Sequence, residues 1–151
     1  MDQHTERMNG AGESWSAALQ QRIIETADEY HYIAEDQWSR VADLDPTNDE
    51  LVFEFRRLIR AALVHYMRAY LELDMIETDA EQQLEDLYEI VCEQQLELAE
   101  FFEQNNMLDV LGEESHANLS KLFSVAEAMR TILLDRSNQL AATLEARFAD
   151  Q

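Results

Sequence analysis

The stretch LVFEFRRLIRAALVHYMRAYLELD, residues 51–74, decides the fold. Its apolar positions recur every three or four residues without a miss: Val52, Phe55, Ile59, Ala62, Tyr66, Ala69 and Leu73. Leu58, Leu63 and Tyr70 widen this line on both sides. An apolar stripe with this period predicts an α-helix, and its width predicts packing against neighbours on more than one side.

The same spacing continues on both sides of this stretch. Further inward-facing lines are Ile23, Ala27, Tyr30, Ala34 and Val41; Leu84, Leu87, Val91, Leu98 and Phe102; and Leu119, Leu122, Ala126, Met129, Leu133, Leu140 and Leu144. They predict helices over about 14–44, 79–104 and 113–149, beside one over about 47–74. The chain holds 3 Gly and 1 Pro, which is too few turn residues for a sheet protein.

The breaks between these helices fix the architecture. Pro46 in DLDPTNDE, residues 43–50, should end the first helix. Thr47 with Glu50, and Thr78 with Glu81, have capping-box spacing and should begin the next two. Long helices with short links favour an all-α fold: a single antiparallel up-down four-helix bundle over residues 14–151, with a short extra helical turn near 106–111. Residues 1–13, polar and containing two glycines, should form a flexible tail.

Charge narrows the classes of partner. The 151 residues include 32 acidic and 11 basic side chains, for a net charge of -21, and Lys121 is the one lysine. Such a field opposes direct binding to nucleic acid or to an anionic membrane, because both rely on Lys and Arg. Two interpretations stay open. The acidity is an adaptation to high salt, or it mimics nucleic acid and inhibits a basic protein.

Cysteine usage and hydropathy bear on the compartment. Cys92 is the single cysteine and has no partner for a disulfide, which suits a reducing cytoplasm. No apolar run approaches the roughly 18 residues that a membrane span needs. The sequence has no Gly-rich phosphate loop and no zinc-like Cys/His spacing, so we expect no cofactor.

The segment RAALVHY, residues 60–66, holds the one pair suited to chemistry, Arg60 and His65. Each helical residue turns by about 100°, so positions five apart point roughly 140° from each other. The two side chains cannot converge on a phosphate within one regular helix. We therefore expect no catalytic residues, and Arg60 with His65 is the alternative.

Four of the ten arginines fall within 13 residues: Arg56, Arg57, Arg60 and Arg68. Three of them, Arg57, Arg60 and Arg68, should share the outer face of the helix. They form a candidate anion site, because a guanidinium offers a fork of donors to phosphate. The simpler interpretation is local pairing, of Glu54 with Arg57 and of Arg68 with Glu72.

A metal centre is a second alternative. Di-iron bundles use Glu-x-x-His on two helices, and Glu113 with His116 has that spacing, while Asp28 with His31 offers only Asp-x-x-His. Glu113 also suits an ordinary helix start, where acids favour the helix dipole. We therefore expect no metal.

Aromatic and apolar residues exceed what the inward lines need: Trp15, Trp38, Phe101, Phe102, Phe123 and Phe148. The loop NNMLDVLG, residues 105–112, adds Met107, Leu108, Val110 and Leu111. Surplus apolar clusters often mark a partner surface. We expect these four loop residues and Phe101 to form an interaction patch and the protein to be a homodimer. In the alternative, the loop folds back and caps the bundle.

Residues 56–92, RRLIRAALVHYMRAYLELDMIETDAEQQLEDLYEIVC, resemble part of the HEPN family. The resemblance lies in an Ala- and Tyr-containing helix, a short Ile-x-x-Thr link and a Leu-rich helix ending in Cys. It implies a small helical bundle, often dimeric. Active members carry Arg-x(4–6)-His near the start of a late helix. Here that spacing falls at Arg60 and His65, midway along the second helix. The resemblance therefore favours a non-catalytic partner module, with a protein of unknown identity as its partner. A HEPN-type ribonuclease using Arg60 and His65 is the alternative, as is the nucleic-acid mimic.

Overall fold

The computed structural model describes residues 2–45, 47–104, 106–112 and 117–149; the side chains of 2–16, Asp49 and 147–149 lie outside this description. Within these ranges every regular element is helical. In chain order they are α1 (Asp2–Ala42), a 3-10 turn (Asp49–Leu51), α2 (Val52–Leu73), α3 (Leu84–Gln94), α4 (Leu96–Gln104), α5 (Met107–Leu111) and α6 (Leu119–Ala149).

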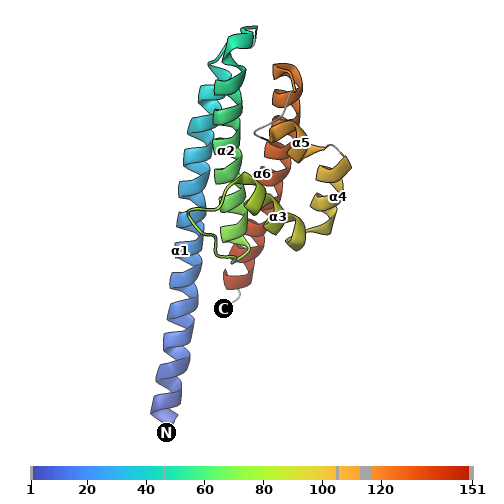
Figure 1. Cartoon of the computed structure of the whole chain (residues 1–151). Helices are drawn as coiled ribbons and strands as arrows, with labels where there is room; N and C mark the ends of the chain where they lie inside the picture. The colour runs from blue at the N-terminus through green and yellow to red at the C-terminus, as the bar shows by residue number, and fades with distance from the viewer. Residues whose placement is uncertain (1, 46, 105, 113–116, 150–151) are drawn as a thin grey trace.

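Three long helices form the frame (Figure 1). α2 lies between α1 and α6 and runs antiparallel to α1, whereas α6 runs in the same direction as α2. The short helices α3, α4 and α5 cover α2 and α6 on the side away from α1. The all-α prediction is confirmed. The four-helix bundle is not, because short helices stand where a third long helix was expected.

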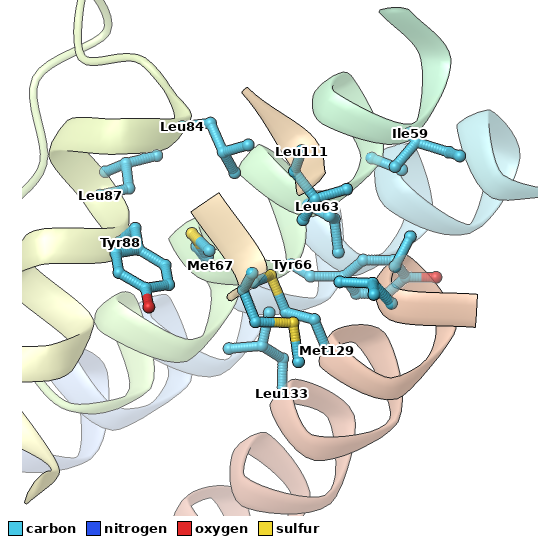
Figure 2. Close-up of a cluster of buried hydrophobic side chains, with 14 of the residues drawn as sticks. Ile59, Leu63, Tyr66, Met67, Leu84, Leu87, Tyr88, Leu111, Met129 and Leu133 are labelled. Carbon is cyan, nitrogen blue, oxygen red and sulfur yellow. The ribbon is translucent and has the colours of Figure 1, made fainter. Parts of the chain in front are cut away.

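The core follows the predicted lines. Every residue in the four inward lines is buried, except Tyr30, Val52 and Leu140, which are half-buried. Figure 2 shows how α2 joins the layers: Leu63, Tyr66 and Met67 point among side chains from α3, α5 and α6. The apolar stripe of α2 is thus wide because neighbouring helices enclose α2 on several sides.

The predicted third helix is divided at Gln95. This residue has φ -137° and ψ 98°, an extended conformation that separates α3 from α4. The inward line runs through Leu84, Leu87 and Val91 and then meets Gln94 and Gln95, where an apolar side chain would continue it. The helix therefore breaks at the position where its buried face is interrupted by polar residues.

Both predicted capping boxes are wrong. α2 begins at Val52 after a 3-10 turn, while Thr47 donates its backbone N–H and hydroxyl to Asp45. α3 begins at Leu84, and its capping box pairs Gln83 with Asp86. Thr78 is occupied by a contact with Arg68 and lies in the loop between α2 and α3.

The ends of the short elements have local causes. α5 starts after Asn106, which adopts φ 52°, a left-handed conformation that Asn tolerates better than most residues. It ends at Gly112, where an added Cβ would lie 2.9 Å from the carbonyl oxygen of Leu108. This extra helical element near 106–111 was predicted.

The first helix is longer than expected. α1 starts at Asp2 and includes residues 2–13, which the sequence predicts as a tail; the mobility of that segment stays a prediction. Its N-terminal end extends past the ends of α2 and α6 (Figure 1). Among the described residues, no helix combines the length and the apolar character needed to cross a bilayer.

Candidate binding groove on the outer face of the last helix

An apolar groove of about 1050 Å³ runs along the first half of α6. Its lining residues are Val41, Ala42, Leu44, Phe55, Phe101, Leu119, Ser120, Phe123, Ser124, Glu127, Ala128, Thr131 and Ile132. Eight of these belong to α6, and the others come from the end of α1, the link that follows it (Leu44), the start of α2 and α4. The groove is therefore a surface of α6 with a wall on each side.

The α6 residues form one continuous stripe. The lining positions advance in pairs, each four residues after the last, from Leu119 with Ser120 to Thr131 with Ile132. At 1.5 Å per residue this stretch is about 20 Å long. Ser120, Ser124 and Ala128 are small and lie four apart along its length. The floor is thus nearly four helical turns long and has a row of small side chains along it.

Three aromatic side chains contribute to the lining of the groove. Phe123 is 36% exposed and stacks on Trp38 of α1, with ring centroids 5.6 Å apart. Phe55, from α2, is buried at the base of the groove, and half-buried Phe101 approaches from α4. The guanidinium of Arg130 lies over the Trp38 ring, 5.1 Å from the ring centroid. The aromatic wall is thereby held by contacts between α1 and α6.

A polar network behind this wall ties the three long helices together. The hydroxyl of Tyr66 donates to Glu35 Oε1 at 2.7 Å and accepts from Arg130 Nε at 2.7 Å. Arg130 Nη2 also donates to both carboxylate oxygens of Glu35, at 2.9 and 3.0 Å. Tyr66 is fully buried, and burial followed by the hydrogen bond to Glu35 raises the pKa of its hydroxyl. Tyr66 therefore stays a neutral link between a cation and a carboxylate.

Arg60 and His65 point to different helices. Arg60 donates to the backbone carbonyl of Leu111 at 2.7 Å and pairs with Glu85 at 2.7 Å, so it faces α3 and α5. His65 faces α1, where Nδ1 lies 3.0 Å from Gln37 Oε1. The two side chains therefore diverge, and their spacing predicted this divergence.

The arginine cluster is also dispersed. Arg57 is exposed and pairs with Glu54, as expected from their spacing. Arg68, expected on the outer face, is buried instead. Arg56 is half-buried nearby on α2. The outer face was placed wrongly because α3 and the loop before it cover this side of α2.

Arg68 organises that loop. Its guanidinium donates to the Thr78 hydroxyl at 3.0 Å and to the backbone carbonyls of Asp79, at 3.0 Å, and Gln82, at 3.1 Å. A third carbonyl, that of Ala80, lies at 3.4 Å. This contact set holds residues 78–82 out of helix and explains why α3 starts at Leu84.

The predicted interaction patch lies mostly inside the protein. Met107, Val110 and Leu111 are buried and Leu108 is half-buried, because α5 packs on α6. The loop folds back onto α6, as the alternative expected; that it caps the end of a bundle stays a prediction. From the predicted patch, Phe101 is the residue that lines the groove.

Of the metal candidates, Glu113 and His116 lie outside the described residues. Asp28 is exposed on α1, and His31 is half-buried beside the Tyr66 ring. No group of His, Cys, Asp and Glu in the described part of the chain could hold a metal ion. Burial raises the pKa of the Cys92 thiol, which opposes a role as a nucleophile.

No protein-family model, curated protein or solved structure matches this chain. The groove must therefore be interpreted from its own geometry. Sequence analysis had identified Trp38, Phe101 and Phe123 as surplus aromatics. That two of them line one groove was not predicted, because tertiary packing alone brings Phe101 of α4 and Phe123 of α6 to the same groove. The available signal was the row of small residues on α6 next to Phe123.

Proposed function

We propose that this protein is a non-catalytic binding protein and that the groove on α6 holds one helical segment of a partner protein. The groove itself carries the proposal: an apolar floor about 20 Å long on α6, bordered by residues from the other helices and containing Phe55, Phe101 and Phe123. Amphipathic helices bind proteins through grooves of this kind, with apolar side chains three or four residues apart as anchors. The row of Ser120, Ser124 and Ala128 leaves room for a helix to approach closely.

A small-molecule ligand fits less well. The groove, at about 1050 Å³, lies at the upper end of the usual range of about 300–1,000 Å³ for such sites, and it follows the surface of a helix. Its lining includes no Arg, Lys or His, so an anionic headgroup would find no partner. An extended apolar surface with few polar groups favours a protein segment.

Catalysis is not part of the proposal. Arg60 and His65 are engaged with different helices, and the groove has a single ionisable lining residue, Glu127. A non-catalytic, HEPN-like partner module in the cytoplasm is the wider role that we propose. The acidic surface serves it by repelling nucleic acid.

Photo-crosslinking in the source cells tests the proposal. A photoreactive benzoylphenylalanine is placed at Phe123 in the groove, or at Tyr32, an aromatic residue that is 78% exposed on α1, as the matched control. We expect a covalent adduct with one other protein at Phe123 and none at Tyr32.

Three results would contradict the proposal. They are the absence of an adduct at Phe123, the same adduct at both positions, and an adduct of this chain with itself. The last would show that a second copy occupies the groove, as a homodimer requires.

A further inference from the structure

The charge carried by the lining of the groove is negative. Glu127 lines the groove, and its side chain is exposed. Asp43 and Asp45 are exposed next to Ala42 and Leu44, and Glu100 is exposed next to Phe101. Asp43, Asp45 and Glu100 are neighbours of the lining in sequence, whereas Glu127 is itself part of the lining.

Two arginines near the groove pair with carboxylates outside its lining. The pKa of Asp45 is lowered by its hydrogen bonds from Thr47. Arg130 pairs with Glu35, and Arg136 pairs with Glu97. The exposed Lys121 belongs to α6 but does not line the groove.

We infer that the helix bound in this groove is basic as well as amphipathic, with an apolar face on α6 and Lys or Arg on its flanks. This inference rests on the proposed function and adds the chemistry of the partner. Opposite charges across an interface speed association and exclude wrong partners, while like charges oppose binding. A net charge of -21 strengthens this selection at long range.

A second copy of the chain meets the opposite situation. Two α6 helices paired through the same face would place Glu127 of each copy in one interface, between two bodies of charge -21 each. Like charges make this arrangement less favourable than a basic helix. The charge pattern therefore favours a heterologous partner over self-association.

Synthetic peptides of about 14 residues, the length of the Leu119–Ile132 stretch, test the inference. The first has Leu at helical spacing and Lys on both flanks. The second keeps the Leu face and replaces Lys with Glu, and the third scrambles the first. Binding to the full chain is measured by fluorescence anisotropy between about 0.05 and 0.5 M NaCl.

We expect the basic amphipathic peptide to bind at least about tenfold more tightly than either control at low salt, and less tightly as salt rises. Ser124→Arg on the groove floor should weaken it by about tenfold or more, because it adds both bulk and positive charge. Asn138→Arg adds the same charge at an exposed site on α6 outside the lining and should have a much smaller effect.

The outcomes separate this inference from the proposed function. If the scrambled peptide binds as well, or both arginine variants act alike, binding is only attraction to a polyanion, and the inference is overturned. If the acidic and basic amphipathic peptides bind equally and Ser124→Arg weakens both, the groove accepts helices without regard to charge. The inference then fails while the proposed function stands. If none of the peptides binds but a Phe123 adduct forms in cells, the inference likewise fails while the proposed function stands.

Discussion

Removing one oxygen atom from the core tests the polar network between the long helices. Tyr66→Phe keeps the buried ring and deletes the hydroxyl that joins Glu35 to Arg130. Both partners are charged, and Tyr66 is fully buried, so water cannot easily replace the missing group. The substitution should therefore lower the free energy of unfolding without changing the fold.

The structure sets the size of the effect. A hydrogen bond to a charged group contributes about 1.5–3 kcal/mol, and two such bonds are lost. Arg130 and Glu35 keep their direct contacts at 2.9 and 3.0 Å, and the Glu35 side chain is half-exposed. Their remaining contact and hydration offset part of the loss. We expect about 2 kcal/mol, which corresponds to a fall in Tm of about 4–8 °C for a chain of this size.

Urea denaturation followed by circular dichroism measures this difference, with Tyr32→Phe as the control. Tyr32 is 78% exposed, so its hydroxyl is hydrated in both states and the change should stay within about 0.5 kcal/mol. A double-mutant cycle with Arg130→Gln should give a coupling energy of about 1 kcal/mol. A loss for Tyr66→Phe no larger than that of Tyr32→Phe would refute the reasoning, since the network would then contribute no stability.

Arg68, His31 and the net charge each have a measurable effect on stability. Arg68→Met should lower the free energy of unfolding by about 3 kcal/mol, because it leaves the loop carbonyls without their donor. The control, exposed Arg57→Met, should lower it by no more than about 0.5 kcal/mol. Equal losses in urea denaturation would contradict the role of Arg68. Burial lowers the pKa of His31 below its ordinary 6.5, despite Asp28 and Glu35 nearby, so the unfolded state binds the proton more readily. The stability due to neutral His31 is present above pH 6.5 and is lost as pH falls through 6.5 toward the folded pKa. The free energy of unfolding of the wild type should therefore fall relative to that of His31→Asn between pH 7 and 5. A difference between the two proteins that stays constant with pH would refute this. Finally, NaCl should raise Tm until screening saturates, near a Debye length of about 3 Å at 1 M. The reason is that the acidic side chains behind the net charge of -21 repel one another in the folded protein. A flat or falling Tm would show that this repulsion does not limit stability.

Features that repeat along one helix were predictable from the sequence. The inward line of α2, from Phe55 to Leu73, is buried because a three-to-four spacing leaves a helix one way to hide its apolar side chains. The same rule predicted that Arg60 and His65 would diverge. Neither inference required knowledge of the neighbouring helices.

Features that depend on contacts between distant segments were not predictable in this way. Arg68 falls outside the apolar line, so periodicity placed it in solvent, whereas backbone carbonyls from the following loop enclose it. Backbone acceptors leave no trace in a sequence, because every residue carries one. The groove likewise depends on tertiary packing, which brings Phe101 of α4 and Phe123 of α6 into one lining.

The length of α1 affects how the molecule moves through solution. Its 41 residues span about 60 Å, whereas the 22 residues of α2 span about 33 Å. A particle with one protruding rod has a larger frictional coefficient than a sphere of equal mass. The monomer of 17.6 kDa should therefore leave a gel-filtration column early, at the volume of a heavier globular standard. Elution volume alone would imitate a dimer, and sedimentation velocity, which separates mass from friction, would tell the two apart.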